Sequence, residues 1–141
     1  MVDVDAFYKA SKNGELDIIE RFVSNGLTIT DIRANFNRAL ILATKGGHLD
    51  VIKRFVSLGL TIEDIRSNCV HALMIACEIR RVDIVEYFIS LGLIEDDIRA
   101  NNNLALHIAA VRGEMEMARI LVKAGHLTID ECRGNGYINN E

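Results

Sequence analysis

The chain has 141 residues, half of them apolar and 26% charged, with a net charge of −4. This length fits one compact domain or one short solenoid, and the apolar share excludes intrinsic disorder, which combines low hydrophobicity with high charge. The acidic balance gives no long-range attraction for nucleic acid, and no apolar run approaches the roughly 20 residues of a membrane helix. We therefore expect a folded protein that binds neither nucleic acid nor a membrane.

Two further features favour a cytoplasmic protein. The acidic start of the chain, residues 1–5, lacks the apolar stretch of a signal peptide. The three cysteines, Cys69, Cys77 and Cys132, form no even framework for disulfides. Reduced thiols in a cytosol-like compartment are therefore expected.

A unit of 33 residues repeats along the chain. The segment Asp31–Asn35 recurs as Asp64–Asn68 and as Asp97–Asn101, each one unit further on. A partial echo, Arg133–Asn135, comes one residue late, which places an insertion near His126. Three more columns keep the same step: Gly26, Gly59, Gly92 and Gly125; Ala10, Ala43, Ala76 and Ala109; and Phe22, Phe55, Phe88 and Leu121.

Each unit predicts two helices. In the second unit, small apolar residues over Ala39–Ala43 predict a short first helix, which Gly46 and Gly47 end. Apolar residues at helical spacing over Leu49–Val56 predict a second helix, and Gly59 stands where a left-handed residue commonly ends one. The predicted first helices are 5–12, 38–45, 71–78 and 104–111, and the second helices are 15–25, 48–58, 81–91 and 114–124.

A period of 33 residues with two helices per unit is typical of ankyrin repeats. The segment Leu106–Gly113 resembles the family's L-H-x-A-A-x-x-G motif, and Gly47–Ile52 resembles G-H-x-x-V-V. The resemblance implies an all-α fold, an ankyrin-type α-solenoid of four helix-pair repeats. It implies a single domain over residues 1–141, with repeats at 5–37, 38–70, 71–103 and 104–137 and a short tail at 138–141.

The chain also departs from the family pattern. The Thr-Pro pair that opens the family's first helix is absent, and Arg80-Arg81 replaces Gly-His in the third unit. The D-I-R-A-N-N segment at Asp97–Asn102 resembles the ankyrin arrays of giant amoeba-infecting DNA viruses, which are mimivirus-like. That resemblance implies a viral protein in the cytoplasm of an infected host.

The segment between the second helix of one repeat and the first helix of the next is here called the finger. Thr28–Asp31, Thr61–Asp64 and Thr128–Glu131 have the form of capping boxes, in which a hydroxyl and an acid three residues later bond the first N–H groups of a helix. In an ordinary ankyrin β-hairpin, Ile32 and Ile65 would be exposed. We therefore predict short fingers that contain a helical turn instead of a β-hairpin.

No constellation of residues predicts catalysis or a bound ion. The histidines and cysteines lack the C-x-x-C or H-x-x-x-H spacing of a metal site. Nothing orients Cys69 and His71 as a nucleophile and its base, and Gly134–Gly136 lacks the third glycine and the preceding strand of a dinucleotide site. We expect no enzyme, no cofactor and no metal.

Charged residues recur at two finger positions. The arginine row consists of Arg33, Arg66 and Arg99, and the acid row consists of Asp31, Asp64 and Asp97. Two interpretations stay open. Either the rows neutralise each other and order the fingers, or the arginine row holds carboxylates of a partner with its planar, multi-donor groups.

The resemblance implies a non-enzymatic module that binds a partner protein through its concave finger and first-helix face, as an adaptor or an inhibitor. The alternative is a structural array that dimerises or stacks end to end without a separate client. We expect a monomer or weak homodimer, and a partner surface that is acidic or polar with an aliphatic anchor. The predicted contact residues are Arg33, Arg38, Lys45, Arg66, His71, Glu78, Ile79, Arg99, Val111 and Arg112.

Solenoid ends need a polar outer face, and the last unit lacks one. It keeps the internal-looking apolar segment Leu104–Ile108. We expect Tyr137 and Ile138 to cover this segment in part.

Overall fold

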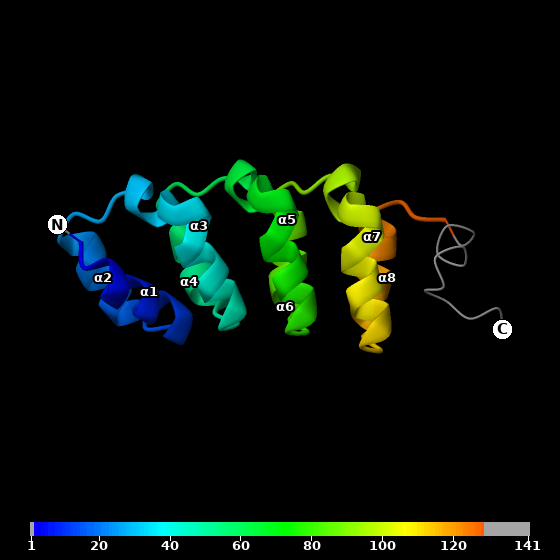
Figure 1. The fold of residues 1–141 in the computed structure, drawn as a ribbon, viewed down its shortest axis with the longest axis horizontal. Helices are drawn as coiled ribbons and strands as arrows, with labels where there is room; N and C mark the ends of the chain where they lie inside the picture. Colours follow the sequence, from blue (N-terminus) through cyan, green and yellow to red (C-terminus); the bar gives the residue numbers. More distant parts are fainter. Residues whose placement is uncertain (1, 129–141) are drawn as a thin grey trace.

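The computed structural model describes residues 2–128, without the side chains of residues 68–70. These residues form four helix pairs, set side by side in chain order (Figure 1). The predicted all-α solenoid of helix pairs is confirmed. The pairs are α1 (Val4–Asn13) with α2 (Leu16–Ser24), α3 (Ile29–Lys45) with α4 (Leu49–Ser57), α5 (Ile62–Glu78) with α6 (Val82–Ser90), and α7 (Glu95–Val111) with α8 (Met115–Ala124).

The core lies within each pair and between neighbouring pairs. First helices pack against one another, α1 on α3, α3 on α5 and α5 on α7. In each first helix the alanine of the repeated column is buried there, because only a small side chain lets the helix backbones approach closely. These alanines are Ala10, Ala43, Ala76 and Ala109. Second helices supply larger buried side chains, including Phe55 and Phe88.

The fingers contain the helical turns that the sequence predicts. In the finger before α3, the Thr28 N–H donates to the Asp31 carboxylate at 2.8 Å, and α3 then begins at Ile29. Thr61 and Asp64 repeat this bond at 2.8 Å. The third predicted box, at residues 128–131, extends beyond the described residues. The isoleucine of each described turn is buried in the core, as expected for helical fingers: Ile32, Ile65 and Ile98.

A left-handed bend separates the finger turn from the first helix that follows in α3 and in α7. In α3, Ala34 is extended, and the next three residues are left-handed with φ of 54°, 58° and 59°: Asn35, Phe36 and Asn37. In α7 the residues over 101–103 bend in the same way. Asparagine suits these positions because it enters the left-handed region more readily than other residues with a Cβ.

The turns between first and second helices join neighbouring repeats. The His48 Nε2 lies 2.9 Å from the carbonyl oxygen of Lys12, and a Cβ at Gly14 would overlap the His48 ring. In the third pair, Arg81 stands in the place of this histidine and donates to the Gly47 carbonyl. Arg81 therefore makes the same kind of contact between repeats as His48.

Arg80 adopts the left-handed conformation that glycines adopt in the other three turns. Its φ is 62°, against 72°, 74° and 70° at Gly14, Gly47 and Gly113. A residue with a Cβ is strained in this region, whereas glycine is not. The ion pair between Arg80 and Glu114, at 3.4 Å on the surface, offsets little of that strain.

Replacing Arg80 with glycine should therefore stabilise the protein. We expect Arg80→Gly to raise the free energy of unfolding by about 0.5–1 kcal/mol, measured by urea denaturation. The matched control is Arg112→Gly, because Arg112 has φ of −86° and gains nothing from glycine. A loss of stability in Arg80→Gly equal to that in the control would contradict this explanation.

The insertion that the sequence places near His126 lengthens the last helix. Helix α8 has 10 residues, whereas α2, α4 and α6 have 9 each. In the earlier repeats a left-handed glycine such as Gly59 precedes the finger, but here Gly125 is helical and His126 is left-handed with φ of 49°.

The last first helix keeps the apolar residues noted in the sequence. Within α7, Leu106 is buried, and Leu104 and Ile108 are half-buried. The expected cover from Tyr137 and Ile138 lies outside the described residues.

Candidate partner-binding surface

The ten predicted contact residues lie in three groups along the array. Arg33, Arg66 and Arg99 belong to the finger turns. Arg38 and His71 follow the fingers, where the first helices begin. The remaining five lie where the first helices end: Lys45, Glu78, Ile79, Val111 and Arg112. The second and third groups lie about 10 Å apart along each first helix, from the rise of 1.5 Å per residue.

The arginine row binds forward, from one repeat to the next. The Arg33 Nε donates to the Asp64 carboxylate at 2.9 Å, and its Nη2 donates to the same carboxylate at 3.1 Å and to the Gly59 carbonyl at 3.3 Å. Arg66 donates to Asp97 at 2.9 Å and to the Gly92 carbonyl at 3.1 Å. Each guanidinium therefore joins its own finger to the finger of the next repeat.

Arg99 continues this pattern with backbone acceptors. It donates to the Gly125 carbonyl at 2.7 Å and to the His126 carbonyl at 2.9 Å, and it pairs with Glu95 at 3.2 Å. This geometry favours the interpretation in which the two rows order the fingers, because each guanidinium already donates to the next repeat.

The contacts between fingers shift the pKa of Asp64 and the pKa of Arg66. Partial burial tends to raise the pKa of the Asp64 carboxyl, but the hydrogen bonds from Arg33 and Thr61 outweigh burial and hold the pKa below its usual value. In the next contact along the array, the hydrogen bond to Asp97 raises the pKa of the Arg66 guanidinium. The first shift favours the charged form of the Arg33–Asp64 pair, and the second favours that of the Arg66–Asp97 pair.

The groups at the two ends of the first helices are mostly open to solvent. Val111 is 72% exposed. Ile79 is half-buried and packs against the core, so Val111 is the more accessible of the two aliphatic residues. The exposed charged members of these groups are Arg38, Lys45, His71, Glu78 and Arg112.

The model of the family described as ankyrin repeats, in three copies, matches residues 60–131, about half of the chain. The protein belongs to the ankyrin repeat family. Ankyrin repeats are generally protein–protein interaction modules and are typically non-catalytic. None of the curated proteins matches the chain.

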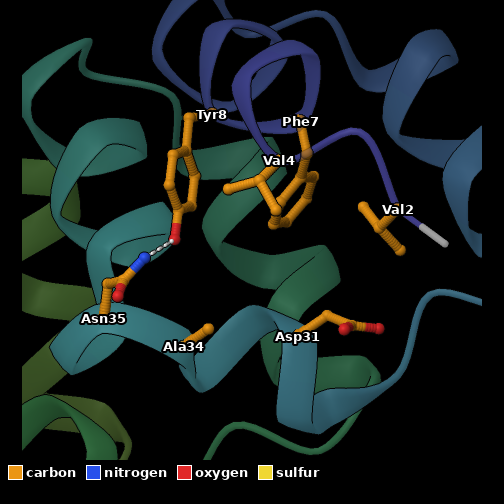
Figure 2. Close-up of a pocket in the computed structure, with 7 residues that line it drawn as sticks. All are labelled: Val2, Val4, Phe7, Tyr8, Asp31, Ala34 and Asn35. Atoms are coloured by element: carbon orange, nitrogen blue, oxygen red, sulfur yellow. Dashed lines mark hydrogen bonds between the residues drawn. The ribbon is translucent and has the colours of Figure 1, made fainter.

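This ankyrin array also exposes a residue that the sequence did not place on the surface. Phe36, in the left-handed bend, is 81% exposed. Beside it, the Asn35 Nδ2 donates to the Tyr8 hydroxyl at 2.8 Å, as Figure 2 shows, and the Arg38 guanidinium lies 5.7 Å from the centre of the Tyr8 ring. The 33-residue period carries a signal for this exposure, because Cys69 and Asn102 occupy the position of Phe36 in the next two repeats.

One nucleophilic side chain in the described part of the ankyrin array, that of Cys77, is buried in the core. Burial raises the pKa of the Cys77 thiol to about 12, so the reactive thiolate is scarce near neutral pH. Among the described side chains, which leave out those of residues 68–70, no three histidines, cysteines or acids gather that could hold a metal ion. No helix within residues 2–128 is both long and apolar enough to cross a bilayer.

Proposed function

We propose that this ankyrin array binds a partner protein through its fingers and the exposed ends of its first helices, as an adaptor or an inhibitor. The supporting observation is that exposed apolar and cationic residues lie together on these segments. Phe36 and Val111 are highly exposed, and Arg38, Lys45 and Arg112 are exposed beside them. The chain as a whole is acidic, with a net charge of −4.

The chemistry of this surface suits an acidic or polar segment with an aliphatic anchor. Binding energy at protein interfaces concentrates in a few desolvated apolar residues and arginines. Val111 with Arg112, and Phe36 with Arg38, each place an apolar side chain next to or near a guanidinium in the chain. Either pair could receive the aliphatic anchor of the partner.

We further propose that the protein works in the cytoplasm, and in a host cytoplasm if it is viral. The support is the D-I-R-A-N-N segment at Asp97–Asn102 and the odd number of cysteines, three, which favours reduced thiols over a disulfide framework. Nucleic acid is a poor partner for a chain of this charge.

A partner captured from a cytoplasmic extract allows a direct test. Val111→Asp combined with Arg112→Glu should weaken binding about 30-fold or more, because truncation of a hot spot costs about 2 kcal/mol or more. Isothermal titration calorimetry measures the affinity, and circular dichroism checks that the double variant stays folded. Ile79 is left intact because it packs against the core.

The control is Glu86→Arg, an exposed change on the second helix α6. It should leave the affinity unchanged. Unchanged binding in the double variant, with weaker binding in the control, would move the site to the second-helix surface. A chain that self-associates in light scattering and captures no partner would favour the alternative of a structural array.

A further inference from the structure

Two of the contacts between fingers use the same kind of acceptor site. A guanidinium enters between the acid-row carboxylate of the next repeat and the carbonyl of the glycine that precedes that finger. Asp64 with Gly59 receives Arg33, and Asp97 with Gly92 receives Arg66. The donor is arginine in each case, and its planar group can serve a carboxylate and a carbonyl together.

The finger before α3 carries the same acceptor pair, Asp31 with the Gly26 carbonyl. Its carboxylate is held in the same way, because the Thr28 N–H and hydroxyl bond one Asp31 oxygen at 2.8 Å and 3.0 Å. The corresponding distances between Thr61 and Asp64 are 2.8 Å and 3.2 Å. Along residues 2–128, no arginine, lysine or histidine pairs with Asp31.

Open space lies at this acceptor pair. A cavity of about 410 Å³ is lined by both acceptor residues, by a second carboxylate and by apolar walls: Val2, Asp3, Phe22, Asn25, Gly26 and Asp31. A second cavity of about 60 Å³ adjoins Asp31 on the side of α1, and Figure 2 shows the Asp31 carboxylate pointing away from Asn35 toward the space below Val2. Phe22 and Val2 can pack against the apolar stem of a long cationic side chain, as such stems commonly do.

We propose that the Asp31 carboxylate and the Gly26 carbonyl form a binding site for the arginine side chain of a partner protein. This arginine site lies at the α1–α2 end of the array and shares no residue with those named for the surface proposed above. The ligand would bind as Arg33 binds Asp64 and Gly59, with its fork on the carboxylate and one further N–H on the carbonyl. Lysine would bind less well, because a single ammonium cannot meet both acceptors in this geometry.

The test uses the whole chain, labelled with ¹⁵N, and N-acetyl-arginine amide as the probe. Saturable shifts are expected at the backbone amides of Gly26, Thr28 and Asp31, and N-acetyl-lysine amide should bind more weakly. Asp31→Asn should weaken arginine binding about tenfold or more, because it removes a charge-assisted hydrogen-bond acceptor. Asp17→Asn, an exposed acid on α2, should leave binding unchanged. Equal binding of the two probes, or binding that survives in Asp31→Asn, would overturn the site.

A gain of function keeps the test informative if Asp31→Asn proves unstable. Val2 lines both cavities, so Val2→Arg places a guanidinium at the site within the same chain. This variant should melt at a higher temperature than the natural chain and should no longer bind the arginine probe. Val2→Gln should do neither. Undiminished probe binding in Val2→Arg would contradict the proposal.

Light scattering of the unmodified chain separates the two sources of arginine. A monomer at all concentrations supports a partner protein as the source. Self-association that disappears in Asp31→Asn would show that a second copy supplies the arginine, and it would overturn the assignment to a partner.

Discussion

Phe55→Ala should lower the free energy of unfolding by about 3–5 kcal/mol, the usual cost of removing a buried aromatic side chain. Phe55 is 0% exposed in α4, and its ring centre lies 5.9 Å from that of Phe7 in α1. The change therefore removes a contact between the first two helix pairs and leaves a cavity in the core. Since domains of this size are stable by only about 5–15 kcal/mol, urea denaturation should show a large shift of the midpoint.

Phe36→Ala is the matched control, because it removes the same side chain from a surface position. Phe36 is 81% exposed, so we expect its replacement to change the free energy of unfolding by no more than about 0.5 kcal/mol. Similar losses in the two variants would show that Phe55 does not have the packing role described here.

Asp64→Ala should lower the free energy of unfolding by about 2–3 kcal/mol. The variant loses the cap at Thr61, which contributes about 1 kcal/mol, and a charge-assisted contact with Arg33, which contributes about 1–2 kcal/mol after allowance for solvent. The Asp64 side chain is 11% exposed and that of Arg33 is 42% exposed, so the pair is only partly screened. Urea denaturation near neutral pH measures the loss.

Asp31→Ala isolates the two contributions, because Asp31 caps Thr28 but has no arginine partner among residues 2–128. We expect it to cost about 1 kcal/mol, the contribution of the cap alone. Equal losses in Asp31→Ala and Asp64→Ala would mean that the pairing between fingers adds nothing to stability.

The natural chain should have a higher free energy of unfolding than Asp64→Ala, and this difference should depend on pH. The folded pKa of Asp64 lies below its usual value of 3.8, so the charged carboxylate contributes fully to stability above that pH. The contribution is lost as pH falls through the lower, folded pKa. The difference in free energy of unfolding between the natural chain and Asp64→Ala should therefore become smaller in acid.

The helices and the helical fingers were predictable because their signals are local. Apolar spacing within ten residues marks each helix, and a threonine three residues before an acid marks the finger turns before α3 and α5, as at Thr28 and Asp31. The bend at Asn35–Asn37 was not predictable from periodicity, because the spacing of apolar residues carries no information on the sign of φ. Asparagine tolerates the left-handed region but does not require it.

The candidate surface was predictable only as a set of positions. The 33-residue period places the arginine and acid rows side by side, but the pairing of Arg33 with Asp64, and not with Asp31 of its own finger, depends on how closely the repeats stack. Ile79 and Val111 stand one residue apart in the repeat, yet one is half-buried and the other is exposed. Such differences come from neighbouring repeats that the local sequence does not specify.

The forward pairing of the fingers bears on how a gene for this protein can change in length. Arg33 and Arg66 each bond an acid 31 residues further along the chain. A tandem duplication of any 33-residue stretch inside the array therefore adds one donor and its acceptor together. An out-of-phase insertion between an arginine and its acid would instead change the separation of that pair. Growth by whole units is thus the route that keeps each of these partly buried carboxylates paired with an arginine.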